Sequence, residues 1–210
     1  MTDTMARRAH WEEVYATKAE DEVSWFQEHP AMSLDLIRAA GVGPDAAVID
    51  VGGGASRLVD ALLDEGFHAV TVLDLSEKAL AASRVRLGPQ RASRVTWIAA
   101  DATTWQPKAA AYDLWHDRAA FHFLTDAPGR AAYVERLAKA LRPGGHAVIA
   151  TFAADGPERC SGLPVVRYDA ASLAAALGDR FERVETRPHE HHTPMGRIQR
   201  FQFSRFRKTG

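Results

Sequence analysis

The chain has 210 residues, of which 46% are hydrophobic and 25% charged, values typical of one soluble globular domain spanning residues 1–210. Its 26 basic and 27 acidic side chains leave a formal net charge of -1, which excludes the overall basic field that favours nucleic-acid binding. Because Cys160 is the single cysteine and no apolar run approaches the ~20 residues that span a bilayer, we expect a cytoplasmic protein without disulfide or membrane partner.

Residues 1–29 form an aromatic-rich arm ahead of the first predicted strand. Its aromatic side chains are Trp11, Tyr15, Trp25 and Phe26. Two interpretations stay open: a lid that folds over a ligand, or a helix that caps the domain. After the arm, Pro30 begins a predicted helix over 31–40, which ends at Gly41.

A glycine-rich stretch follows the first predicted strand. The apolar run 46–49 suits a strand that is buried on both faces, and it leads into Asp50, Gly52, Gly53 and Gly54. Residues 56–63 then carry apolar residues at helical spacing. Because glycines let the backbone approach a ligand closely, this strand–turn–helix unit predicts a binding loop. The sixth position of a dinucleotide fingerprint would be Arg57, which fits that fingerprint poorly.

The second and third predicted strands each end in an acidic residue. Residues 69–74 end at Asp74, which lies 20 positions after Gly54. That spacing is close to the ~20 residues expected for an acid that accepts hydrogen bonds from ribose hydroxyls. Ser76 is placed to cap the helix predicted over 77–87, and the third strand, 93–101, ends at Asp101.

The fourth predicted strand, 112–118, ends in a cluster of polar residues. Ligands of open α/β sheets bind at the carboxyl ends of the strands, so His116, Asp117, Arg118 and His122 are expected near the reacting groups. A helix over 130–141 and a Pro-Gly-Gly turn precede the fifth predicted strand, 146–152. In the last third, 181–189 and 197–207 are joined by so short a turn that the two strands must pair antiparallel.

These ordered features resemble the class I, seven-stranded S-adenosylmethionine-dependent methyltransferases. The resemblance rests on Asp50-x-Gly52-x-Gly54, the Leu-Arg-Pro-Gly-Gly turn before the fifth strand, and the final antiparallel pair. Where the family often has a third glycine, this chain has Ser56. The resemblance implies an α/β fold with a doubly wound, mostly parallel seven-stranded sheet, helices on both faces and a C-terminal antiparallel hairpin strand.

The resemblance also implies a ligand and its contacts. The ligand is S-adenosylmethionine, with S-adenosylhomocysteine as product, and an acid or its neighbour after the third strand contacts the adenine amino group. The expected cofactor contacts are Asp50, Gly52, Gly53, Gly54, Asp74, Leu75, Asp101, Ala102 and His116. Base candidates, by location, are His116, Asp117 and His122. Candidates for contact with the acceptor are Trp25, Arg118, Cys160 and His192.

The sequence does not identify the molecule that accepts the methyl group. The chain looks closest to small bacterial methyltransferases, and more distantly is similar to lysine methyltransferases acting on citrate synthase or elongation factor 1A. Those enzymes often show Asp-Lys-Gly-Thr where this chain has Asp117 to Ala120. Three hypotheses follow: transfer to a small molecule, transfer to a protein lysine, and a non-catalytic protein that binds S-adenosylmethionine.

The histidines near the end of the chain do not predict a metal site. His189, His191 and His192 fit no ligand spacing of known zinc sites, and the adjacent pair would point to opposite faces of a strand. We expect no metal there, and a surface turn or a wall of the acceptor pocket instead. The sequence does not indicate an oligomeric state.

Overall fold

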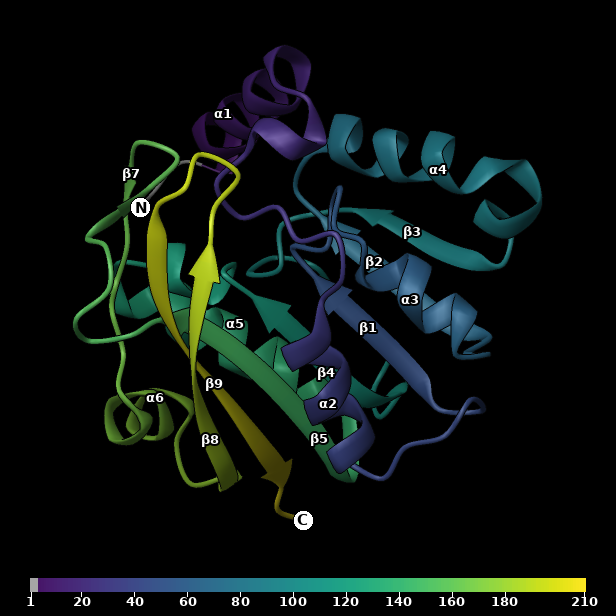
Figure 1. Ribbon diagram of the computed structural model, residues 1–210. Helices are drawn as coiled ribbons and strands as arrows, with labels where there is room; N and C mark the ends of the chain where they lie inside the picture. The colour runs from purple at the N-terminus through teal and green to yellow at the C-terminus, as the bar shows by residue number, and fades with distance from the viewer. Residues whose placement is uncertain (1–3) are drawn as a thin grey trace.

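A seven-stranded sheet forms the centre of the computed structural model, which describes residues 4–210 (Figure 1). The strand order is β3-β2-β1-β4-β5-β9-β8. The strands of this sheet are β1 Ala47–Val51, β2 Ala69–Asp74, β3 Val95–Ala99, β4 Tyr112–Arg118, β5 Leu141–Phe152, β8 Phe181–His192 and β9 Ile198–Lys208. Strands β1 to β5 run parallel, whereas β9 is antiparallel to both β5 and β8. The predicted fold class is confirmed.

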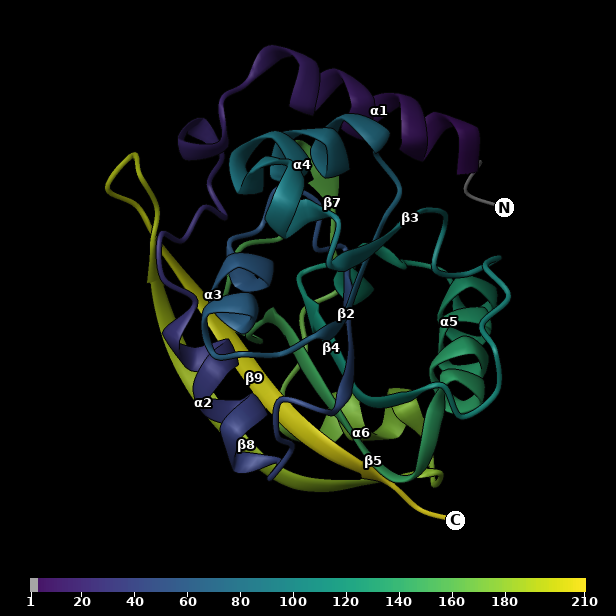
Figure 2. The same cartoon turned by 90° about the vertical axis from the view of Figure 1, so that its right-hand side faces the viewer.

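Helices cover both faces of the sheet. They are α1 Thr4–Thr17, α2 Ala31–Ala39, α3 Leu58–Asp64, α4 Glu77–Ala92, α5 Ala127–Ala140 and α6 Ala170–Leu177. Helices α2, α3 and α4 lie on one face, and α5 and α6 lie on the other (Figure 2). The apolar side chains of each set pack against the sheet. Among the helices of residues 4–210, none is long and apolar enough to cross a membrane.

The strands at the centre are apolar along their length because both of their faces are covered. In β1, Val48 packs among the side chains of α2 and α3, whereas Ile49 packs with those of α5, and both are fully buried. The same holds in β9, where Phe203 packs toward α2 and Phe206 toward α5. The absence of strict alternation in these strands is therefore a consequence of the three-layer arrangement.

Several boundaries differ from the sequence-based expectation for identifiable reasons. The helix expected over 130–141 begins at Ala127, because the Asp126 carboxylate caps it by accepting a hydrogen bond from the Gly129 N–H at 2.7 Å. Ser76 caps α4 as predicted. The segment between β5 and α6, which carries Cys160, contains a small hairpin of β6 Arg159–Cys160 and β7 Leu163–Pro164.

The N-terminal arm crosses the edge of the sheet where the parallel strands end (Figures 1 and 2). Helix α1 contacts α4, where the Glu12 carboxylate accepts a hydrogen bond from the Glu77 N–H at 2.6 Å. It also reaches the β6–β7 hairpin, where His10 Nε2 lies 3.4 Å from Ser161 Oγ. The arm thus bridges segments that are far apart in sequence, and its function as a lid stays a prediction.

Candidate active site

A cavity lies under the arm at the carboxyl ends of β1, β2 and β4. The arm contributes its roof, the loops after the strands its floor, and the β6–β7 hairpin one wall. The lining residues are Arg7, Trp11, Tyr15, Trp25, Val51, Gly52, Leu73, Asp74, Leu75, Ala100, Asp101, Ala102, Thr103, Arg118, Ala119, Ala120, Phe123, Leu124, Thr125, Tyr133, Cys160, Leu163 and Pro164. Five of the predicted cofactor contacts and three of the predicted acceptor contacts are therefore brought together in one cavity.

The glycine loop after β1 needs glycine for steric reasons. Gly52 has a φ of +71°, its N–H donates to the Leu73 carbonyl at 2.8 Å, and an added Cβ would lie 2.7 Å from the Ala120 Cβ. At Gly54 an added Cβ would lie 2.7 Å from Asp74 Oδ2. The loop is thus packed tightly against the ends of β2 and β4, which keeps its backbone available to a ligand.

Beneath the loop, Asp50 forms a buried polar chain that the sequence did not reveal. Its Oδ1 lies 2.7 Å from His116 Nδ1, and His116 Nε2 lies 2.9 Å from Ser33 Oγ on α2. Both ring nitrogens of His116 are therefore engaged away from the cavity. Asp50 Oδ2 is buried without a hydrogen-bond partner in the described chain, and it lies where a Cβ on Gly53 would intrude. Asp50 does not line the cavity, so this acceptor lies beneath the glycine loop.

Asp74 lines the cavity at the end of β2, as predicted. Its Oδ1 accepts a hydrogen bond from the Ser76 N–H at 2.8 Å. Burial, with a further contribution from the charge of Asp50, raises the pKa of Asp74 to about 7. A ligand that donates hydrogen bonds to this carboxylate would offset the loss of solvation, which fits a pair of ribose hydroxyls.

Asp101 lines the cavity but directs its carboxylate to the arm and its own loop. Its Oδ2 accepts hydrogen bonds from Thr4 Oγ1 at 2.8 Å and Arg7 Nη2 at 2.5 Å, and Oδ1 accepts from the Thr103 N–H and hydroxyl. Burial alone would raise the pKa of Asp101, but the donors from Thr103 and Thr4 and the charge of Arg7 lower it. The carboxylate therefore attaches the arm beside the predicted adenine position, where Ala102 also lies.

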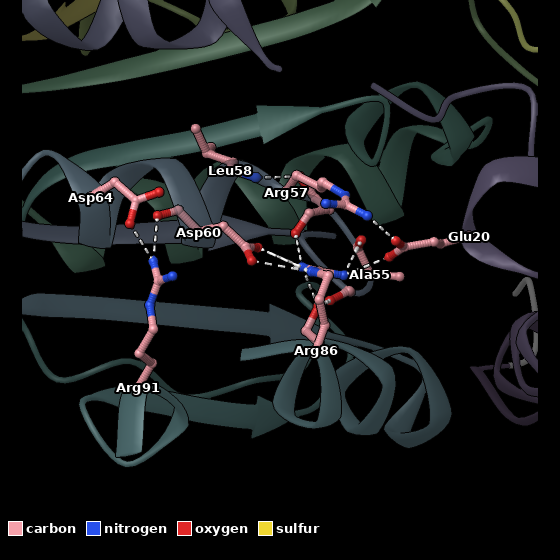
Figure 3. A network of polar contacts seen from close by, with 11 residues as sticks. Glu20, Ala55, Arg57, Leu58, Asp60, Asp64, Arg86 and Arg91 are labelled. Atoms are coloured by element: carbon pink, nitrogen blue, oxygen red, sulfur yellow. Dashed lines mark hydrogen bonds and ion pairs between the residues drawn. The ribbon is translucent and has the colours of Figure 1, made fainter. Parts of the chain in front are cut away.

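A second attachment joins the arm to the glycine loop (Figure 3). Glu20 pairs with Arg57 and, at 2.7 Å, with Arg86 Nη1 of α4. Arg86 also donates to the carbonyls of Ala55 and Ser56 and pairs with Asp60 at 2.6 Å. One guanidinium therefore holds the glycine loop, α3 and the arm together.

The predicted bases do not reach the cavity lining. Asp117 is fully buried, accepts from the Ala120 and Phe121 N–H groups and lies 2.5 Å from the Tyr133 hydroxyl. Burial raises its pKa to about 6. His122 is also fully buried, and its pKa is lowered to about 3 by burial and by the charge of Arg118. Both side chains support the turn after β4, and within residues 4–210 no histidine lines the cavity.

The predicted acceptor contacts divide into two groups. Trp25, Arg118 and Cys160 line the cavity, whereas His192 lies in a separate groove at the tip of the β8–β9 hairpin. Burial raises the pKa of the Cys160 thiol to about 12, so the thiol is neutral near pH 7. Sequence reasoning did not single out Arg7 or Tyr133, which also line the cavity. Only the i, i+4 spacing of Trp11 and Tyr15 signalled that one helical face of the arm would turn inward.

The comparisons with known proteins agree with this geometry. Residues 48–145 match a family described as a methyltransferase domain. No curated protein matches the sequence.

Three solved structures are similar over nearly the whole chain. A Burkholderia thailandensis 1,6-didemethyltoxoflavin-N1-methyltransferase, solved with 1,6-didemethyltoxoflavin and S-adenosylhomocysteine, is 21% identical (TM-score 0.71; 100% of this chain and 92% of that chain covered). The N-methyltransferase NodS from Bradyrhizobium japonicum with S-adenosylhomocysteine is 19% identical (TM-score 0.70; 95% and 98%). A putative methyltransferase of Haloferax volcanii in complex with the Trm112 activator is 15% identical (TM-score 0.73; 95% and 98%). The chain therefore has the class I methyltransferase fold, with the sequence match confined to residues 48–145.

Proposed function

We propose that this protein is an S-adenosylmethionine-dependent methyltransferase that acts on a small-molecule acceptor. The observation that carries the proposal is the continuity of the cavity. One end is formed by the glycine loop and Asp74, and the other end is enclosed by aromatic side chains of the arm and by the β6–β7 hairpin. The match of residues 48–145 to a methyltransferase domain and the S-adenosylhomocysteine in two of the similar structures support the choice of cofactor.

The residues present fit this cofactor. Asp74 offers a carboxylate to the ribose hydroxyls, and Gly52 brings its backbone to the cavity without a side chain. When bound, the cofactor supplies an electrophilic methyl on a sulfonium, which an in-line nucleophile attacks. The protein orients the two reactants and excludes water, and orientation is the larger requirement of such a displacement.

The side chains that line the cavity indicate whether the protein could remove a proton from the acceptor. Its ionisable side chains on the acceptor side are Tyr15, Arg118, Tyr133 and Cys160. The pKa values of both tyrosines are raised by burial, and that of Cys160 is raised to about 12, so none accepts a proton near pH 7. We infer an acceptor whose nucleophilic atom carries no proton in solution near pH 7, such as an unprotonated ring nitrogen, a thiolate or an enolate.

A protein lysine is the alternative acceptor and would need an open channel for the extended side chain. The roof formed by α1 and the wall formed by the β6–β7 hairpin favour a small molecule. Transfer from S-adenosylmethionine carrying a labelled methyl group tests this, with a cell extract split into macromolecular and small-molecule fractions. We expect label in the small-molecule fraction. Label on protein instead would support the lysine alternative, and label in neither fraction with intact cofactor binding would support a non-catalytic protein.

A further inference from the structure

Arg118 stands at the end of β4, where it lines the cavity and a smaller void beside the glycine loop. Its Nη1 donates a hydrogen bond to the Trp25 carbonyl at 2.8 Å, and its guanidinium lies over the Phe201 ring, 5.3 Å from the centroid. These contacts hold the guanidinium plane beside the arm. They leave its charge without a counter-charge, because both partners are uncharged.

One edge of the Arg118 guanidinium has no partner. Within the described chain, Nε and Nη2 are buried and donate a hydrogen bond to no acceptor. These two nitrogens form the edge that holds a carboxylate through two parallel hydrogen bonds. A buried cation with unused donors costs folding free energy, so its presence at a cavity indicates a ligand group that satisfies it.

The other partly buried arginines near the cavity are paired, which makes Arg118 the exception. Arg86 pairs with Asp60 and Glu20 (Figure 3), and Arg7 pairs with Asp101. Burial lowers the pKa of Arg118 to about 10, against the weaker raising effects of Cys160 and Asp50. Its positive charge also lowers the pKa of His122. Among the described residues, Arg118 therefore has no ion-pair partner within contact distance.

The cavity beside Arg118 is aromatic. Trp11 lies edge-on to Trp25, with ring centroids 5.7 Å apart, and edge-on to Phe123, with centroids 5.1 Å apart. Tyr15 also packs edge-on against Trp25, with ring centroids 6.3 Å apart. Such walls favour a flat, apolar body, because ring contacts add to the burial of apolar area. This part of the cavity therefore combines aromatic walls with the unpaired guanidinium of Arg118.

We propose that Arg118 binds the carboxylate of an aromatic acid and so selects the methyl acceptor. This inference rests on the proposed function and names its substrate class. The same chemistry has a second source, since S-adenosylmethionine itself carries a carboxylate. We assign the site to the acceptor because Arg118 is anchored on Trp25 and Phe201, which pack in one apolar cluster with Phe123 and Cys160, and the experiment separates the two sources.

Calorimetry on the full-length protein tests the assignment with matched probes. S-adenosylhomocysteine is titrated first, which tests the proposed function by itself. 2-Naphthoate and its neutral isostere 2-naphthamide are then titrated, with and without S-adenosylhomocysteine. Two charge-assisted hydrogen bonds should make the acid bind at least about tenfold more tightly than the amide. Arg118→Met should remove that preference, and Arg118→Lys should keep part of it.

The controls separate recognition from folding. Arg200→Met, which removes an exposed arginine paired with Asp155, should keep the preference for the acid. Arg118→Met should melt at or above the wild-type temperature, because it removes an unpaired buried cation. Equal affinity for acid and amide, binding of neither, or a preference that persists in Arg118→Met would overturn the proposal.

The second part of the experiment tests whether Arg118 binds the cofactor. It uses 5′-methylthioadenosine, which lacks the carboxylate of S-adenosylhomocysteine. We expect Arg118→Met to change the affinities for both nucleosides by less than about twofold. If the variant loses about tenfold of its affinity for S-adenosylhomocysteine and none for 5′-methylthioadenosine, the cation binds the cofactor and the acceptor assignment fails. Failure of wild type to bind S-adenosylhomocysteine would instead refute the proposed function.

Discussion

The two halves of the cavity are built in different ways. In the cofactor half, Gly52 directly follows β1, Asp74 is the last residue of β2 and Ala102 lies in the loop after β3. These three strands are neighbours in the sheet, which places the residues side by side. In the acceptor half, Trp25, Arg118 and Cys160 come from the arm, from the end of β4 and from the β6–β7 hairpin. The first half depends on local backbone geometry, and the second depends on the docking of distant segments. Substitutions in the two halves should therefore affect ligand binding in different ways.

The largest effect is expected in the glycine loop. Gly52→Val should abolish binding of S-adenosylhomocysteine, because residue 52 has a positive φ and its side chain would collide with Ala120. The backbone strain alone would cost about 1–3 kcal/mol. Calorimetry measures the loss. Gly43→Val is the matched control, since a Cβ there meets nothing within 4 Å; near-normal affinity in Gly52→Val would contradict the assignment of this loop.

The next effect is expected at Asp74. Asp74→Ala should weaken binding of S-adenosylhomocysteine by roughly 1–3 kcal/mol through lost charged hydrogen bonds. Measured against the 2′,3′-dideoxy analogue, which lacks the ribose diol, the variant should show no further loss. An equal loss with both ligands would place the carboxylate elsewhere than at the ribose.

The raised pKa of Asp74 predicts a pH dependence that is specific to the cofactor half. Since the pKa lies near 7 in the free protein, the carboxylate is increasingly protonated below that pH and accepts fewer hydrogen bonds. The affinity for S-adenosylhomocysteine should therefore rise with pH between about 6 and 8.

The stability of the free protein should change in the opposite direction. The contribution of Asp74 to the free energy of unfolding is full below its unfolded pKa and decreases as pH rises through about 7. Asp74→Asn should flatten both profiles, and unchanged slopes would rule out Asp74 as their origin.

A smaller effect is expected where the arm meets the cofactor half. Arg7→Ala removes the ion pair with Asp101, and the remaining contacts of α1 should keep the fold intact. We expect release of S-adenosylhomocysteine to accelerate several-fold, because the roof opens more often. Stopped-flow tryptophan fluorescence reports this through Trp11. Arg8→Ala, at an exposed position of the same helix, should release the ligand at the wild-type rate; equal rates in both variants would argue for a static cap.

The smallest effect is expected outside the cavity. His192→Ala should leave cofactor affinity and methyl transfer within about twofold of wild type, since residue 192 lies in a separate groove. Activity assays with the labelled cofactor check this. A tenfold loss of transfer would show that the β8–β9 tip reaches the acceptor after all.

The same contrast explains what could be predicted from the sequence. Strands β2 and β4 have the predicted bounds because both are buried runs that end in polar residues. Helix α6 was missed, although Asp169 and Ser172 form a capping box at its start. The cofactor half needed only strand order, so Asp74 and Gly52 were placed correctly in the cavity.

The acceptor half could not be predicted to the same depth. Position at a strand end does not reveal how far a side chain lies below the surface. His116 is two residues before Arg118 on the same face of β4, yet it is buried against Ser33 of α2, whereas Arg118 reaches the cavity. The roles proposed for His116, Asp117 and His122 depend on a helix and a turn whose packing the local sequence does not encode.

The insertion of β9 between β5 and β8 affects the order in which the protein assembles. Strand β8 joins the sheet only through β9, and β5 gains its last neighbour only when β9 pairs with it. Until then β5 presents an unpaired, apolar edge to solvent, and such edges recruit other chains. Pairing across some 50 residues is slow to form. Refolding yield should therefore fall as protein concentration rises, and a chaperone that shields this edge should restore it.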